Sequence, residues 1–231
     1  MSEIAKALPH KPSSLNDTGI NNSLCYLLDS NPSVDDLGDH MVSCDSLAAR
    51  ELSKQQDGMV GRDVTANDYN DGYVGFSFTK IGADGEALPV TASHWTCVKD
   101  NVTGLLWENK TSDGGLHDDS KRFTNNSANQ GLADDASGFI FALNQQNFCG
   151  ISSWRLPTVE ELHSIVDYST TFQGISRDTT FFQNNASSSW TSSACVVEAD
   201  CTWIVDLTYG SVYSFPTEVD TKLSIRLVSF K

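Results

Sequence analysis

The chain has 231 residues, and its 30 acidic side chains against 15 basic ones give a formal net charge of −15 at pH 7. This length suits one large domain, or one domain with an extension, and allows a sizeable hydrophobic core. The negative field repels the phosphates of nucleic acids and anionic membranes, and it also disfavours sulfated glycans. The composition therefore argues against nucleic acid as a partner and indicates a solvated acidic surface.

Six cysteines indicate disulfide bonds rather than a metal centre, because no CxxC pair or Cys/His cluster has zinc-ligand spacing. Six cysteines permit fifteen connectivities, and the order along the chain favours Cys25–Cys44, Cys97–Cys149 and Cys195–Cys201. Disulfides form in oxidising compartments, so we expect a secreted, periplasmic or cell-surface protein. The first residues show no secretory signal peptide, and no apolar run is long enough for direct membrane insertion.

The composition and hydrophobic periodicity of the sequence change near residue 60. Residues 1–60 are rich in Ser, Asn and Asp and have weak hydrophobic periodicity. This composition predicts a partly ordered N-terminal extension that the Cys25–Cys44 pair staples. We expect residues 61–231 to form the main domain.

The first part of the main domain predicts strands followed by a helix. Apolar and polar residues alternate over 74–80, which is typical of a half-buried strand, and two short strands follow over 95–108. A long polar loop over 109–130 then leads to an amphipathic helix. The apolar face of this helix is expected to comprise Leu132, Ala136, Phe139, Ile140 and Leu143.

A second helix begins at a capping box. Glu161 follows Thr158 by three residues, so the Thr hydroxyl can accept from the N3 amide while the Glu carboxylate reaches back to the Thr amide. We expect Trp154 to lie in the core and Arg155 to pair with a carboxylate such as Glu160. The apolar positions that share one face of this helix are Val159, Leu162, Ile165 and Val166.

The last third of the chain predicts β-structure. A short strand is expected over 189–191, and a hairpin pairs 203–207 with 211–215 around Tyr209-Gly210. Alternation from 223 to 230 predicts a closing strand. Two helices, a small antiparallel sheet, long polar loops and disulfide staples together predict the α+β class.

Aromatic and acidic side chains at this hairpin are the candidate ligand-binding residues. Aromatic faces stack on the C–H surfaces of sugars, carboxylates accept hydrogen bonds from hydroxyls, and aromatics also anchor protein interfaces. Because side chains alternate along a strand, Tyr213 should face away from Val212 and leave one face for the core. The alternative is that the aromatic residues, including Phe215, merely cover the sheet. The candidates are Tyr209, Tyr213, Glu218 and Asp220.

The run over 63–72 is a candidate calcium site, because it is dense in the hard oxygen ligands that calcium prefers. Its spacing does not fit an EF-hand, and the alternative is a polar turn cluster before the first strand. The candidate ligands are Asp63, Asp68, Asn70 and Asp71.

A second acidic stretch, over 113–119, combines His117 with Asp113, Asp118 and Asp119. This combination would suit a metal site or an acid/base group. The alternative is a solvated loop, which is the more common fate of such residues in a Gly-rich segment.

Four segments, in order along the chain, resemble the Legionella collagen-like protein (Lcl) C-terminal domain family: Asp100–Glu108, Trp154–Leu162, Ser189–Ser193 and Ile225–Val228. The resemblance implies a C-type-lectin-like fold with a long loop region that binds ligands in some relatives. It also implies an exported bacterial surface or envelope protein, whose named relative is an adhesin for glycosaminoglycan-like polymers. That ligand suits a chain of net charge −15 poorly, and the calcium-dependent sugar motif of true C-type lectins is absent.

The sequence therefore predicts a non-enzymatic, adhesin-like recognition module that binds a glycan or a surface protein through its loops. No cofactor is expected beyond the candidate calcium. One alternative is a structural component of a pilus, an oligomer or a larger envelope assembly, with residues 1–60 as its attachment arm. Another is an enzyme related to formylglycine-generating enzymes, whose chemistry needs free thiolates.

Overall fold

The computed structural model describes residues 24–26, 41–43, 62, 66, 68, 70–73, 75–168, 178–183, 188–196, 200–217 and 221–230. Within these ranges no helix is long and apolar enough to cross a membrane. In the predicted extension, strands β1 (Leu24–Tyr26) and β2 (Met41–Ser43) pair antiparallel and place Cys25 opposite Val42. Cys44 and most of residues 1–60 lie outside the described residues, so the Cys25–Cys44 bond and the domain boundary stay predictions.

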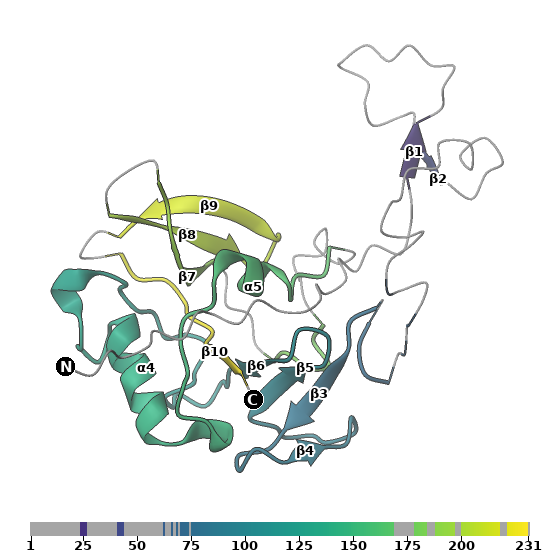
Figure 1. Cartoon of the computed structure of the whole chain (residues 1–231), viewed down its shortest axis with the longest axis horizontal. Coiled ribbons are helices and arrows are strands. Elements are labelled where there is room, and N and C mark those ends of the chain that lie inside the picture. Colours follow the sequence, from purple (N-terminus) through teal and green to yellow (C-terminus); the bar gives the residue numbers. More distant parts are fainter. Residues whose placement is uncertain are drawn as a thin grey trace, which may run out of the picture.

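The first sheet of the main domain is antiparallel and has the strand order β10-β6-β5-β3-β4 (Figure 1). Its strands are β3 (Phe78–Ile81), β4 (Ala87–Leu88), β5 (Cys97–Asp100), β6 (Leu105–Glu108) and β10 (Val228–Phe230). The predicted strand over 74–80 starts later, at Phe78. A turn precedes it, because Gly75 has a φ of 85° and the Phe76 amide donates to the Tyr73 carbonyl.

The expected pair of strands over 95–108 is confirmed as the β5–β6 hairpin. The Asp100 carboxylate closes its turn by accepting from the amides of Val102 and Thr103, at 2.9 and 3.1 Å. Gly104 then takes a φ of 76°, a conformation that residues with a Cβ rarely adopt. Asp100 and Gly104, at the two ends of the turn, therefore determine its conformation.

Both predicted helices are present, although the second ends at His163, before Ile165 and Val166 of its expected apolar face. Helix α4 (Ala136–Gln145) starts where the Asp135 side chain accepts from the Ser137 amide, and it buries Ala136, Phe139 and Leu143. Leu132, expected on the apolar face, lies before the N-cap and is 52% exposed. The prediction for Leu132 was wrong because the N-cap sets the helix start four residues later than its periodicity suggests.

Helix α5 (Val159–His163) has the complete capping box between Thr158 and Glu161. The two carboxylate oxygens of Glu161 also accept from both terminal nitrogens of Arg155, each at 2.7 Å. The partner of Arg155 is therefore Glu161, and the expectation of Glu160 was wrong, since Glu160 is exposed. One carboxylate thus caps the helix and fixes the strand-like segment that precedes it.

The second sheet is antiparallel and has the order β7-β8-β9, and α5 packs against β7 and β8 (Figure 1). Its strands are β7 (Ser188–Ala194), β8 (Cys201–Asp206) and β9 (Ser211–Pro216). The predicted hairpin around Tyr209-Gly210 is confirmed as β8–β9. The predicted closing strand over 223–230 is regular only in β10, and Leu223 and Ser224 instead form isolated bridges with Phe123 and Ser189.

The core has two buried clusters. One contains Trp154 and Trp190 beside α4, and the other contains Trp107 beside α5. The predicted disulfides Cys97–Cys149 and Cys195–Cys201 are both present: the first ties β5 to the 3-10 turn η2 (Phe148–Gly150), and the second spans the β7–β8 connection. An α+β, disulfide-stapled domain is therefore confirmed.

Replacing Glu161 by Ala should lower the free energy of unfolding by about 2 to 3 kcal/mol, because the capping box and the Arg155 contact are lost together. Glu160→Ala is the matched control: it removes the same charge from the same helical turn at an exposed position. That control should change stability by less than about 0.5 kcal/mol. Urea denaturation measures both values, and equal losses in the two variants would contradict the dual role of Glu161.

Candidate functional site

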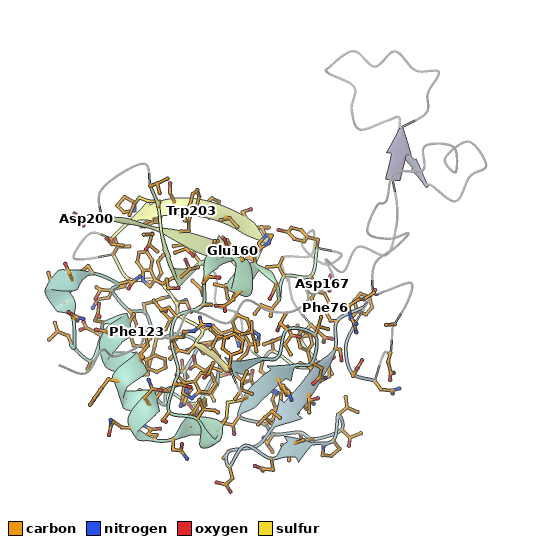
Figure 2. All side chains as sticks on the ribbon, viewed as in Figure 1. Phe76, Phe123, Glu160, Asp167, Asp200 and Trp203 are labelled. Atoms are coloured by element: carbon orange, nitrogen blue, oxygen red, sulfur yellow. A yellow bond between two sulfur atoms is a disulfide. The ribbon has the colours of Figure 1, made fainter. Side chains whose placement is uncertain are left out.

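A cleft of about 810 Å³ lies between the segment that leads into α4 and the part of the second sheet where β8 begins and β9 ends. One wall carries the 3-10 turn η1 (Ser127–Asn129) and the start of α4, and the other carries the ends of the hairpin. Figure 2 shows Asp200 at this end of β8. The cleft is lined by Asn125, Asn126, Ser127, Ala128, Gln130, Asp135, Ser137, Ser192, Asp200, Cys201, Thr202, Pro216 and Thr217.

The lining consists mainly of side-chain amides, hydroxyls and carboxylates. It includes no Lys, Arg or His among the described residues, and its apolar members are Ala128, Cys201 and Pro216. Amides and hydroxyls both donate and accept hydrogen bonds, while an ionised carboxylate only accepts. The cleft therefore suits a ligand that is rich in hydroxyl or other donor groups, and it offers no cation to an anionic ligand.

Asp135 forms a buried part of the cleft wall and is 2% exposed. Its Oδ1 accepts from the amide and hydroxyl of Ser137, and its Oδ2 accepts from the Thr124 hydroxyl at 2.9 Å. A carboxylate with this many donors is satisfied within the protein. Asp135 thus positions the start of α4 against the preceding loop rather than facing a ligand.

Asp200, in contrast, is exposed and is held through its backbone. It has a φ of 63°, and its carbonyl accepts from both the amide and the hydroxyl of Thr217, each at 2.8 Å. The adjacent Cys201 is bonded to Cys195, and the Cys195 amide donates to the Cys201 carbonyl. These contacts fix Asp200 at the cleft while its carboxylate stays accessible.

The residues 96–229 match the family model of the Lcl C-terminal domain. The chain belongs to the Lcl C-terminal domain family. This confirms the resemblance carried by the four sequence segments, and it supports an extracellular recognition module. The disulfides agree with an oxidising compartment. Among curated proteins, none matches the chain.

In this Lcl C-terminal domain, the sequence-predicted aromatic residues lie outside the cleft lining. Tyr209 is in the turn that joins β8 to β9, at the opposite end of the hairpin from the cleft, and is 62% exposed. Tyr213 is 42% exposed on β9. Glu218 and Asp220 lie outside the described residues. The aromatic ligand site therefore stays a prediction, at a different place from the cleft.

The expectation that β9 has one core face and one free face was only half right. Val212 is 38% exposed, close to the value for Tyr213, although their side chains point to opposite faces. Strand β9 lies at the edge of its sheet, which leaves both of these side chains partly uncovered. Further along β9, Phe215 is half-buried and contacts Trp190 edge-on at 6.0 Å, so it serves the core.

The acidic run over 63–72 makes local hydrogen bonds where the structure describes it. The Asp68 carboxylate accepts from the backbone amide and the side-chain amide of Asn70, at 3.0 and 2.8 Å. Asp71 accepts from the hydroxyl of Ser77. The described residues contain no group of three or more His, Cys, Asp or Glu side chains that could hold a metal ion. Asp63 lies outside them, so calcium here stays a prediction.

The structure separates His117 from the acidic residues beside it in the sequence. The Asp118 carboxylate accepts from the Ser120 hydroxyl and from the amides of Gly114 and Ser120, which lowers the pKa of Asp118 to about 2. His117 instead places Nδ1 at 2.9 Å from the buried Glu108 carboxylate and stacks on the Phe148 ring. Loop 113–119 therefore holds its own conformation and turns its histidine inward.

Glu108 is the centre of a buried charged cluster in the Lcl C-terminal domain. Its Oε1 accepts from Lys110 Nζ at 2.8 Å, and its Oε2 accepts from the Leu227 amide at 3.0 Å. Burial alone would raise the pKa of Glu108, but the Lys110 ammonium and the contacts with His117 hold this pKa below its ordinary value of 4.5. The ionised carboxylate is therefore part of the folded structure rather than a proton donor.

Because the folded pKa of Glu108 is lowered, its stabilising effect is present above pH 4.5 and is lost as the pH falls through the folded pKa. Glu108→Gln should lower the free energy of unfolding at pH 7 by about 3 kcal/mol, since it leaves Lys110 buried beside a neutral group. The variant should also lose less stability than the wild type on acidification. Denaturant unfolding from pH 7 to pH 3 measures both effects.

Glu160→Gln, which removes one exposed negative charge, is the control for that experiment. It should keep the acid sensitivity of the wild type. An unchanged pH profile in Glu108→Gln would show that the buried carboxylate does not govern acid stability.

Proposed function

We propose that this chain is an exported, non-enzymatic recognition module that binds a glycan through the cleft between η1 and the ends of β8 and β9. The observation that carries the proposal is the chemistry of the cleft lining. Side-chain amides, hydroxyls and a free carboxylate gather there from segments far apart in the sequence. Sugars present dense arrays of hydroxyl donors and acceptors, and such a lining complements them.

The size of the cleft supports the same proposal. Its volume of about 810 Å³ lies within the range of small-molecule sites, which is roughly 300–1,000 Å³. The cleft is therefore large enough for a short stretch of a sugar chain. The polar lining makes a purely apolar ligand a poor fit, because burial of these groups without partners would cost free energy.

A surface protein is the second ligand class, and the exposed hairpin supports it. Tyr209 and Tyr213 are accessible aromatic side chains, which are enriched at protein interfaces. These residues do not line the cleft, so the two ligand classes predict binding at different places.

Blocking the cleft should abolish glycan binding. Ser127 is exposed on η1, and Ser127→Trp places a large side chain in the cleft without removing a core contact. We expect at least about a tenfold loss of affinity, the effect of losing roughly 1.4 kcal/mol of contacts. Glycan-array screening of the full chain, followed by calorimetric titration of the best ligand, measures the effect.

Two further variants distinguish binding in the cleft from binding at the hairpin turn. Ser152→Trp introduces the same side chain at an exposed position beyond the other end of α4 and should leave binding unchanged. Tyr209→Ala removes the aromatic group of the hairpin turn. Loss of binding in Tyr209→Ala, with Ser127→Trp unaffected, would move the site to the hairpin and contradict the cleft. No binding to any glycan would contradict the proposed ligand class.

A thiol titration tests the non-enzymatic part of the proposal. A formylglycine-generating type of reaction needs reactive thiolates, and all four described main-domain cysteines are in disulfides. We expect no reactive thiol in the denatured, unreduced chain. Two free thiols per chain would contradict that expectation and would support an enzyme, with Cys25 and Cys44 as the residues to examine.

A further inference from the structure

The two segments that build the cleft share an unusual charge pattern. Residues 123–154 and 188–221 contain no Lys, Arg or His. The acidic residues of these two segments are Asp134, Asp135, Glu198, Asp200, Asp206, Glu218 and Asp220. The segments therefore carry formal negative charge without any internal compensation, and a low-dielectric concave surface would concentrate that field.

Three basic residues directly flank these segments, Arg122, Arg155 and Lys222, and none of them lines the cleft. Lys222 follows the second segment directly, and its Nζ lies 2.7 Å from the Asp134 carboxylate. Its charge is therefore matched by an acid that does not line the cleft. Among the described residues, no cationic side chain forms an ion pair with Asp200.

The two carboxylates in the cleft have different roles. Asp135 is buried, and the hydroxyls and amides around it use its acceptor capacity. Asp200 is exposed. The amide and hydroxyl of Thr217 donate to its backbone carbonyl and not to its carboxylate. Its left-handed backbone is one that Asp tolerates better than most residues. Asp200 is thus the accessible acid among the described residues that line the cleft.

We infer that Asp200 is a specificity-determining residue that makes the cleft select a sugar chain bearing free ammonium groups, that is, an amino-sugar polymer with unacetylated amines. The inference rests on the proposed glycan function and specifies its ligand class. A protonated amine donates up to three hydrogen bonds and carries the charge that the cleft lacks. The amides and hydroxyls of the lining bind the neutral hydroxyls of the same chain.

A basic peptide would satisfy the same charge, but the lining favours the sugar. Protein-binding surfaces are centred on aromatic and other apolar anchors, whereas this cleft has no aromatic residue in its lining and most of its lining side chains are polar. The strongly exposed Tyr209 lies at the other end of the hairpin, and the exposed Phe141 lies on α4 outside the cleft lining. An oligolysine probe therefore serves as the competitor in the test.

The test compares two glucosamine oligomers of equal length, one with free amines and one fully N-acetylated, by calorimetric titration of the full chain at a pH where the amines are protonated. The wild type should bind the free-amine oligomer about tenfold more tightly. Asp200→Asn keeps the shape and the backbone preference of the residue, and it should remove most of that difference while it leaves binding of the acetylated oligomer unchanged. Raising the salt concentration should have a similar effect, since an exposed charge pair is screened.

Asp84→Asn is the matched control, because it removes one exposed negative charge at the β3–β4 turn, outside the cleft lining. It should keep the wild-type preference. Equal losses in Asp84→Asn and Asp200→Asn would show that only net charge matters and would overturn the inference.

The remaining outcomes separate the inference from the proposed function. Equal affinity of the wild type for the two oligomers would overturn the selection for amines while the glycan function stands. Tighter binding of oligolysine than of the free-amine oligomer, sensitive to Asp200→Asn, would overturn the sugar as the ligand class. No binding of either oligomer, with other glycans bound, would overturn the inference alone, and no binding of any glycan would overturn both.

Discussion

The buried carboxylate of Glu108 joins the parts of this domain that the sequence keeps farthest apart. It accepts from Lys110 and His117 in the polar loop and from the Leu227 amide near the C-terminus. The Glu108 carbonyl also accepts from Nη1 of the fully buried Arg226, at 2.7 Å. Placing charged groups in the interior is costly unless each has partners. The side chains of this cluster therefore constrain β6, the polar loop and the C-terminal segment to one arrangement.

That C-terminal segment continues the constraint toward the cleft. Leu223 pairs with Phe123, and Ser224 bridges to Ser189 on β7, so one segment contacts the polar loop and the second sheet. Figure 2 places Phe123 beside α4, where its carbonyl accepts from the indole of Trp190. Thr124 follows directly and donates to Asp135. The charged centre and the cleft wall are thus connected through a continuous series of backbone bridges.

Local chemistry made much of this fold predictable from the sequence. The capping box at Thr158, the hairpin around Tyr209-Gly210 and the strands on either side of Asp100 depend on residues close together in the chain. The Cys97–Cys149 and Cys195–Cys201 pairs were also predicted, from the order of the cysteines. The predicted partner of Arg155, Glu160, was wrong. Neighbouring acids on a short helix are equally plausible partners by sequence distance, and only the cap geometry selects Glu161.

The candidate site was less predictable, because its residues become neighbours only through long-range contacts. In the sequence, Asn125 and Ser127 belong to a predicted polar loop. No local pattern indicates that they face Thr202 and Thr217 across a cleft. Of the aromatic residues that drew attention in the sequence, Tyr209 lies at the opposite end of the hairpin and Tyr213 lies outside the cleft lining. The absence of basic residues from both cleft-forming segments was visible in the sequence, but it gains meaning only once the fold brings the two segments together.

Mapping of backbone amide chemical shifts during titration with an oligosaccharide ligand shows directly whether the domain binds a sugar chain in this cleft. Binding in the cleft should give the largest shifts at the amides of Ser127, Thr202 and Thr217, with little change at Tyr209 and Tyr213. Shifts confined to Tyr209, Tyr213 and their neighbours, with the cleft amides unchanged, would place the ligand on the hairpin instead and rule out the cleft.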